Sequence, residues 1–165
     1  PHTGLQTVTW PFAGRVEHRD SEGSIQILNP GELNLMTAGS GISHSELSLV
    51  GSDSLHAAQL WLALPNEQRN VSAFFEHHAE LPSLELGSVN AKVFIGSLGT
   101  ATSPATVYSP LVGAELQISG SSLYAFSSVK FRLSSGKELH RRAINCNYYN
   151  GIDAYMSILD NIKQQ

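Results

Sequence analysis

The chain has 165 residues, 41% of them hydrophobic, which is enough to bury one sizeable core, or one full domain and part of a second. The formal net charge of −4 argues against direct binding of nucleic acid or of an anionic membrane. The single cysteine, Cys146, excludes an intramolecular disulfide and a Cys-rich zinc site. No apolar run approaches the roughly 20 residues of a membrane span, and no signal peptide opens the chain, so we expect a cytoplasmic protein.

The first 50 residues are typical of short strands separated by turns. Asp20-Ser21-Glu22-Gly23 and Asn29-Pro30-Gly31 are turn sequences, and Gly39 and Gly41 give the backbone freedom where a tight bend is needed. Between these turns, β-prone residues partly alternate with polar ones. The predicted strands are residues 7–10, 15–19, 25–28, 33–37 and 42–47.

Further strands are predicted downstream. Residues 55–64, LHAAQLWLAL, are apolar on both alternating faces, which favours a buried strand over an edge strand. Gln59 and Trp61 share one face of it, where either could touch a cavity, and we expect Trp61 in the core. Residues 91–98 and 105–118 add more strands. Strands at this spacing, without a strong helical pattern between them, predict an all-β sandwich or barrel.

The composition changes after residue 118. Residues 1–118 contain 4 Lys or Arg and 11 Asp or Glu, a net charge of −7, whereas residues 119–165 contain 6 and 3, a net charge of +3. Apolar residues between 152 and 162 follow a helical period, and Asn150 or Asp153 could cap its start, so we predict a terminal helix there. We therefore expect one domain over 1–118 and an atypical tail over 119–165.

His44-Ser45-Glu46 is the sharpest local motif. Residues two apart in a strand point to the same face, so His44 and Glu46 would present an imidazole and a carboxylate side by side. His2 lies 42 residues earlier, and antiparallel strands can bring such segments together. Two histidines and one carboxylate form the facial triad of non-haem Fe(II) sites. Taken alone, a His and a Glu two residues apart are more often ordinary surface residues.

Three segments together resemble the pirin family of cupins. They read PHTGLQTVTWPFAGRVEHRD over 1–20, NPGELNLMTAGSGISHSE over 29–46 and LHAAQLWLALP over 55–65. The resemblance covers residues 1 to about 118. It implies a cupin barrel, a double-stranded β-helix or jelly roll, running into the beginning of a second cupin. The segment from Ser119 onward does not resemble the family, so we expect an incomplete C-terminal segment that ends in the predicted helix.

The resemblance also implies a metal site. Pirins hold a metal, usually iron, with three His and one Glu, so His2, His44 and Glu46 would be metal ligands, and Fe(II) is the expected cofactor. The chain begins at Pro1 without Met, and we expect upstream residues to belong to the working protein. The family's remaining His would precede Pro1 directly. Many pirins also carry Glu where this chain has Gln6, a position that is not a ligand.

The function implied by the resemblance is cleavage of flavonols such as quercetin with dioxygen. Glu46 would then be the catalytic residue, acting as a general base on the substrate hydroxyl. The alternatives are a non-enzymatic, metal-responsive protein that binds a protein partner, as the family's link to transcriptional regulation in animals suggests, and an inactive truncated pirin. Of these three functions, only flavonol cleavage requires a small aromatic substrate.

The remaining histidines have simpler interpretations. His18 could line the pocket or donate a hydrogen bond to a ligand, but a structural or exposed position is favoured. His56 opens a strand that looks buried, so we expect a hydrogen-bonded core residue. His77 and His78 stand in a polar stretch, where a solvated face is expected.

Overall fold

The structure is a computed structural model that describes residues 1–49, 54–87, 89–118, 129–132, 138–141 and 155–157. Every regular element in these ranges is a β-strand, which confirms the all-β prediction. The chain divides into two compact units, Pro1–Leu81 and Pro82–Gln165. Among the described residues, no helix is long and apolar enough to cross a membrane.

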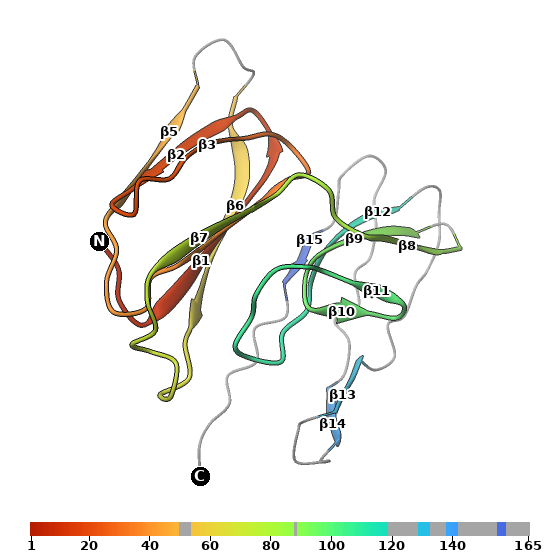
Figure 1. Cartoon of the computed structure of the whole chain (residues 1–165). Coiled ribbons are helices and arrows are strands. Elements are labelled where there is room, and N and C mark those ends of the chain that lie inside the picture. The colour runs from red at the N-terminus through yellow and green to blue at the C-terminus, as the bar shows by residue number, and fades with distance from the viewer. Residues whose placement is uncertain (50–53, 88, 119–128, 133–137, 142–154, 158–165) are drawn as a thin grey trace. The chain divides into compact units, whose positions relative to one another are not determined.

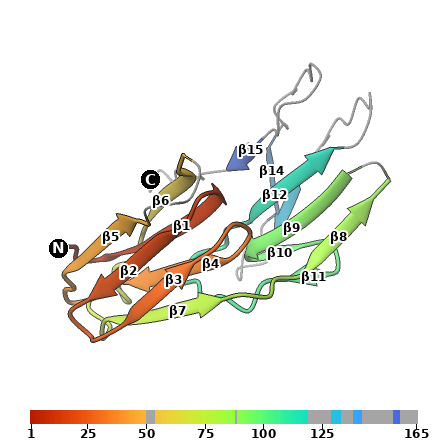
Figure 2. The same cartoon turned by 90° about the horizontal axis from the view of Figure 1, so that it is seen from above.

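The first unit consists of two antiparallel sheets (Figure 1). One sheet has the order β6 (His56–Ala63), β1 (Leu5–Ala13), β4 (Leu33–Thr37) and β7 (Phe74–His78). The other has the order β3 (Ile25–Leu28), β2 (Val16–Asp20) and β5 (His44–Ser48), strands that lie side by side in Figure 2. Side-chain contacts join the two sheets, so we call the facing sides their inner faces.

The four-stranded sheet is organised around β1 and β4, whose residues are buried on both faces. Apart from Gln6 and Asn34, both strands consist of apolar and threonine side chains, and such residues fit a pleated surface with neighbours on each side. Pro11 lies in β1 where the pairing with β6 shifts register, between Pro11 and Ala13. Because proline cannot donate to a ladder, a local irregularity is where a strand accommodates it.

A tight turn between β4 and β5 depends on Gly39. Its φ is +49°, and an added Cβ would lie 1.9 Å from the Val71 carbonyl oxygen. A side chain therefore has no room there, and the left-handed backbone is also one that other residues rarely adopt. The next residue, Ser40, donates its N–H to the same carbonyl at 2.9 Å. This close packing fixes where the chain enters β5, which carries His44 and Glu46.

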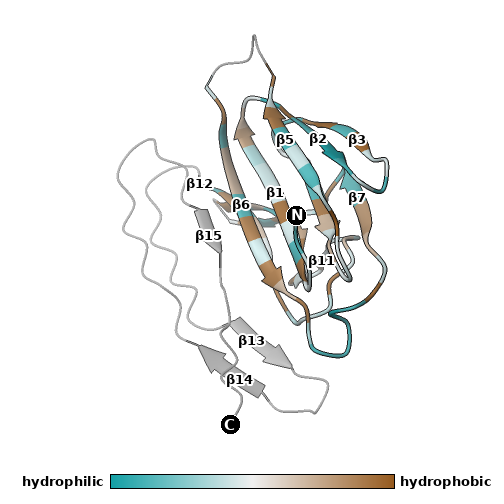
Figure 3. Ribbon diagram, turned by 90° about the vertical axis from the view of Figure 1, so that its left-hand side faces the viewer, coloured by the Kyte–Doolittle hydropathy of each residue, from teal (hydrophilic) through white to brown (hydrophobic). Residues whose placement is uncertain are grey.

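The position of β6 corrects two of the sequence predictions. Among the described strands β6 pairs only with β1, so it is an edge strand rather than a central one. Trp61, expected in the core, is 61% exposed. Leu62 and Leu64 are buried on the opposite face, so the apolar run reflects one packed face and one open face. Figure 3 shows β6 beside β1, with apolar and polar bands alternating along the strands.

The second unit is also built of strands. Its main sheet has the order β15 (Tyr155–Ser157), β12 (Gly113–Ile118), β9 (Val89–Ile95) and β8 (Ser83–Leu86). Two hairpins accompany it, β10 (Ser97–Leu98) with β11 (Ala101–Thr102), and β13 (Val129–Arg132) with β14 (Glu138–Arg141). Val89, Ala91 and Leu116 form its buried apolar cluster.

The predictions for the C-terminal part remain largely open. The helix predicted over 152–162 lies mostly outside the described residues, and the three described positions within it form β15. The domain boundary at residue 118 and the atypical nature of residues 119–165 remain predictions.

Candidate metal centre

The inner face of the three-stranded sheet places four ionisable side chains together. In the ladder between β2 and β5, His18 pairs with Glu46 and Asp20 pairs with His44. Directly paired residues point to the same face, and so do residues two apart on one strand. His44 and Glu46 on β5, two residues apart, therefore lie next to His18 and Asp20 on β2, which have the same spacing.

His18, His44 and Glu46 each offer one ligand atom, and these atoms lie within 4.8 Å of one another. His18 Nδ1 is 3.7 Å from Glu46 Oε1, which is too long for a hydrogen bond. His2 adds a third imidazole, with its ring centroid 5.0 Å from that of His44. Paired backbone hydrogen bonds between His2 and Ile42, of 2.8 and 3.0 Å, hold it there.

Asp20 orients His18. The His18 Nε2 and Asp20 Oδ2 atoms are 3.0 Å apart, so Nε2–H donates to the carboxylate and Nδ1 faces Glu46. The other Asp20 oxygen accepts the N–H groups of Glu22 and Ser24, each at 3.0 Å. Burial by itself would lower the pKa of His18, but Glu46 and Asp20 outweigh it and raise the pKa above its usual value. The ring also stacks on Phe75 at 4.3 Å.

Glu46 is held by neutral donors from the opposite sheet. Thr9 Oγ1 donates to Glu46 Oε1 at 2.7 Å, and Gln59 Nε2 donates to Glu46 Oε2. Burial alone would raise the pKa of this carboxyl, yet the interactions with His18 and Thr9, helped by the nearby His44, hold the pKa below its usual value. Glu46 is therefore an anion fixed from both sides.

The donor set fits a divalent transition metal. His18 Nδ1 and His44 Nδ1 are buried and have no hydrogen-bond partner among the described residues. Burial lowers the pKa of His44; the nearby Glu46 opposes this shift and His18 reinforces it, so that the pKa is lowered overall. The imidazole is therefore neutral and able to ligate. Neighbouring ligand atoms on one tetrahedral ion, at bonds of about 2.1 Å, are about 3.4 Å apart, so a cluster of this spread would draw together on binding the ion.

These positions can be compared with the sequence predictions. The structure places the His2 ring beside that of His44, but the ligand atoms that lie within 4.8 Å of one another belong to His18, His44 and Glu46. The role of His2, His44 and Glu46 as ligands remains a proposal. His18, for which an exposed or structural position was favoured, is 1% exposed and lies within the cluster. The missed signal was the His-x-Asp spacing of His18 and Asp20 in a predicted strand, which repeats that of His44 and Glu46.

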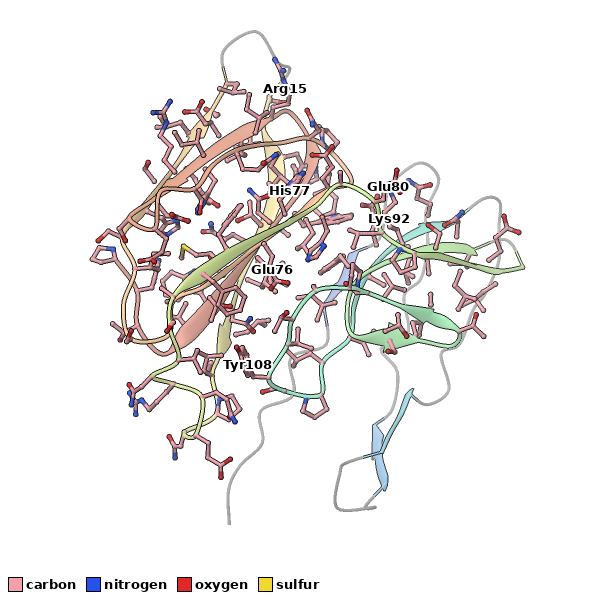
Figure 4. All side chains as sticks on the ribbon, viewed as in Figure 1. Arg15, Glu76, His77, Glu80, Lys92 and Tyr108 are labelled. Carbon is pink, nitrogen blue, oxygen red and sulfur yellow. The ribbon has the colours of Figure 1, made fainter. Side chains whose placement is uncertain are left out.

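Other expectations were wrong or incomplete. His56 is exposed rather than part of the core, and its ring lies 5.0 Å from that of Phe12. His77 is not a simple solvated residue, because its Nδ1 bonds to Asn34 Oδ1 at 2.8 Å on the inner face. Figure 4 shows His77 and Glu76 on opposite sides of β7, as the alternation of a strand requires. Thr9 was not identified as a site residue by the sequence at all.

Comparison with known proteins identifies the family of this chain. The pirin family model, described as "Pirin", matches residues 1–62. A Pseudomonas aeruginosa protein with the provisional name quercetin 2,3-dioxygenase is 49% identical over 116 residues, covering 70% of this chain and 37% of that protein. A pirin-like protein of Caulobacter vibrioides is 45% identical over 118 residues, covering 67% of this chain and 41% of that protein. The chain thus spans about two fifths of the length of these relatives.

Solved structures give the same result. A crystal structure titled quercetin 2,3-dioxygenase from Acinetobacter baumannii is 46% identical, with a TM-score of 0.69 over 71% of this chain and 39% of that one. A Geobacillus kaustophilus protein shares the fold at 24% identity, with a TM-score of 0.69 over 87% of this chain and 66% of that one. The region of the chain that these matches cover therefore belongs to the pirin family of cupins.

Proposed function

We propose that this chain binds a divalent transition metal, Fe(II) in the first instance, through His2, His44 and Glu46, and that the site supports dioxygenase chemistry on flavonol-type substrates. His18 offers a further imidazole to the same ion. The observation that carries the proposal is the cluster of His18, His44 and Glu46, in which two unpartnered imidazole nitrogens and one anionic carboxylate lie within 4.8 Å of one another. His2 is placed beside this cluster by the contact of its ring with that of His44.

The proposed chemistry assigns a separate role to each part of the site. A bound divalent ion would supply Lewis-acid polarisation of a coordinated substrate oxygen and, as iron, redox chemistry with dioxygen. Glu46 is the base nearest to such an oxygen and would accept the proton of the substrate hydroxyl at one of its oxygens. Thr9 and Gln59 would hold that carboxylate in place, and Asp20 would keep His18 in the tautomer that leaves Nδ1 free.

The names of two similar proteins support the choice of substrate class. The Pseudomonas relative is provisionally named for quercetin 2,3-dioxygenase activity, and the Acinetobacter structure is titled with it. Because this chain spans about two fifths of each, its activity, metal, substrate and partners are proposals rather than transferred properties. Placement in the cytoplasm remains a prediction from the sequence.

One observation favours a second candidate function. Both Glu46 oxygens already accept hydrogen bonds, and the pKa of this carboxyl is lowered overall, because the interactions with His18 and Thr9 outweigh its burial. A carboxylate in this state is a good ligand and a weak base. It therefore suits a metal-responsive binding protein that recognises a protein partner without turning over a substrate.

Metal titration combined with an oxygen assay tests both candidates. Fe(II) or Ni(II) is titrated calorimetrically into the metal-free chain under argon, and oxygen consumption is then measured with quercetin. Stoichiometric metal binding followed by quercetin-dependent oxygen uptake is the result expected for a dioxygenase. Tight metal binding without oxygen uptake would favour the metal-responsive binding protein. The absence of specific metal binding would rule out both functions for this chain.

A further inference from the structure

Trp61 combines high exposure with direct contact to the donor cluster. Its side chain is 61% exposed, whereas the chain's other tryptophan, Trp10, is 1% exposed. Its ring makes a T-shaped contact with that of His2, with the centroids 5.0 Å apart and the planes inclined by 69°. A large apolar side chain left in water loses the free energy that burial would give, so its exposure beside a cluster of metal-ligating side chains requires an explanation.

The surroundings of Trp61 leave its indole uncovered. The neighbours on the same face of β6 are Gln59 and Ala63, both exposed, and Ala63 is too small to cover an indole face. Gln59 bonds to Glu46, and Trp61 contacts His2. One face of one edge strand therefore touches the donor cluster at two of its residues.

We propose that Trp61 is a stacking platform for an aromatic ring of the substrate, which lies against the indole while its oxygens reach the donor cluster. This inference rests on the proposed function and deepens it. The substrate class it selects is a planar aromatic of fused rings that carries a hydroxyl next to a carbonyl. Stacking between offset rings accounts for the recognition, and it requires a flat ligand rather than a particular pattern of substituents.

The geometry explains why the ligand is aromatic rather than aliphatic. Since the Trp61 and His2 rings meet at 69° rather than in a stack, their contact holds the indole at the cluster, and 61% of the side chain stays exposed. A flat ring can cover that open surface with an offset stack, whereas a chain-like ligand makes fewer contacts with it. Trp61 thus sets the plane in which the substrate rings lie, and the donor cluster binds the end of the substrate that carries the oxygens.

The test compares 3-hydroxyflavone, which has the hydroxyl next to the carbonyl, with flavone, which lacks the hydroxyl. Dissociation constants are measured calorimetrically for the Ni(II)-loaded and metal-free chain, together with quenching of tryptophan fluorescence. Trp61→Leu is expected to weaken binding of both compounds by about fivefold to tenfold, and Trp61→Phe to restore most of it. Metal is expected to improve binding of 3-hydroxyflavone alone.

Leu47→Ser provides the matched control. Leu47 is 56% exposed on β5, but it points away from the inner face on which His44 and Glu46 lie, so its replacement should leave both affinities unchanged. Metal-dependent binding of 3-hydroxyflavone that is equal in wild type and Trp61→Leu would overturn the platform and leave the proposed function standing. Trp61-dependent binding of both compounds without any gain from metal would overturn the proposed function and support the platform. Binding of neither compound would overturn both.

Discussion

The two sheets of the first unit face the same cluster but contribute different chemistry. The three-stranded sheet supplies the groups that titrate, with His18 and Asp20 on β2 and His44 and Glu46 on β5. The four-stranded sheet supplies neutral hydrogen-bond donors, Thr9 on β1 and Gln59 on β6. One sheet therefore carries the charge that a metal would need, and the other holds that charge in position.

This division of roles makes the sheets unequal in their expected sensitivity to mutation. Removing a charged ligand leaves an ion uncompensated in a partly buried site, where electrostatic interactions are strong. Removing a neutral donor changes only the orientation of a ligand that is still present. We therefore expect substitutions in the three-stranded sheet to act mainly on metal affinity, and those in the four-stranded sheet to act mainly on turnover.

The largest effect is expected from Glu46→Gln. Gln keeps the shape of the side chain but removes the only carboxylate among the four proposed donors, so metal affinity should fall by more than about 100-fold, as when one member of a buried charge pair is lost. Calorimetric titration with Ni(II) measures it. Glu17→Gln is the control, because Glu17 lies on the same sheet, faces away and pairs with Arg19 at 2.6 Å. Equal affinities in wild type and Glu46→Gln would show that Glu46 is not a ligand.

Asp20→Asn should have the next largest effect. The Asn carbonyl can still accept the N–H groups of Glu22 and Ser24, but the amide no longer provides the anion that fixes the ring of His18. If His18 contacts the ion, metal affinity should fall by about 10- to 100-fold, the usual cost of losing such a partner. The same titration measures this. Unchanged affinity would confine the ligand set to His2, His44 and Glu46.

Adding one His before Pro1 should strengthen binding. His2 pairs with Ile42 in an antiparallel bridge, so a residue placed immediately before Pro1 would lie opposite His44 and point to the same face. A further imidazole there should raise Ni(II) affinity by about tenfold, and an added Ala provides the control. If both additions give the same affinity, the antiparallel pairing does not continue beyond Pro1.

The smallest effect on metal binding is expected from Thr9→Val in the four-stranded sheet. Val has the shape of Thr but cannot donate to Glu46, so turnover should fall by about fivefold to tenfold while metal affinity changes less than threefold. Thr37→Val is the control, since it removes the buried bond that Gln6 Nε2 donates at 2.9 Å and should lower stability alone. A loss of metal affinity in Thr9→Val as large as in Asp20→Asn would contradict the division between the sheets.

The sequence by itself determined the fold class and predicted the pair at the centre of the candidate site. Short alternating strands and turn residues predicted an all-β unit, and strands β1 to β6 lie close to their predicted positions. His44 and Glu46 could be predicted because residues two apart in a strand share a face, which is a local rule. The resemblance to pirins added His2, whose distance along the chain from His44 no local rule can bridge.

Only the tertiary structure decided which other groups join that pair. His18 and Thr9 reach Glu46 through pairing and facing of strands that are far apart in sequence, and such contacts have no short-range pattern. The exposure of Trp61 was also beyond the sequence, since an apolar run reads the same in a central strand and an edge strand. What differs is the number of neighbouring strands, and that depends on how the whole chain is arranged.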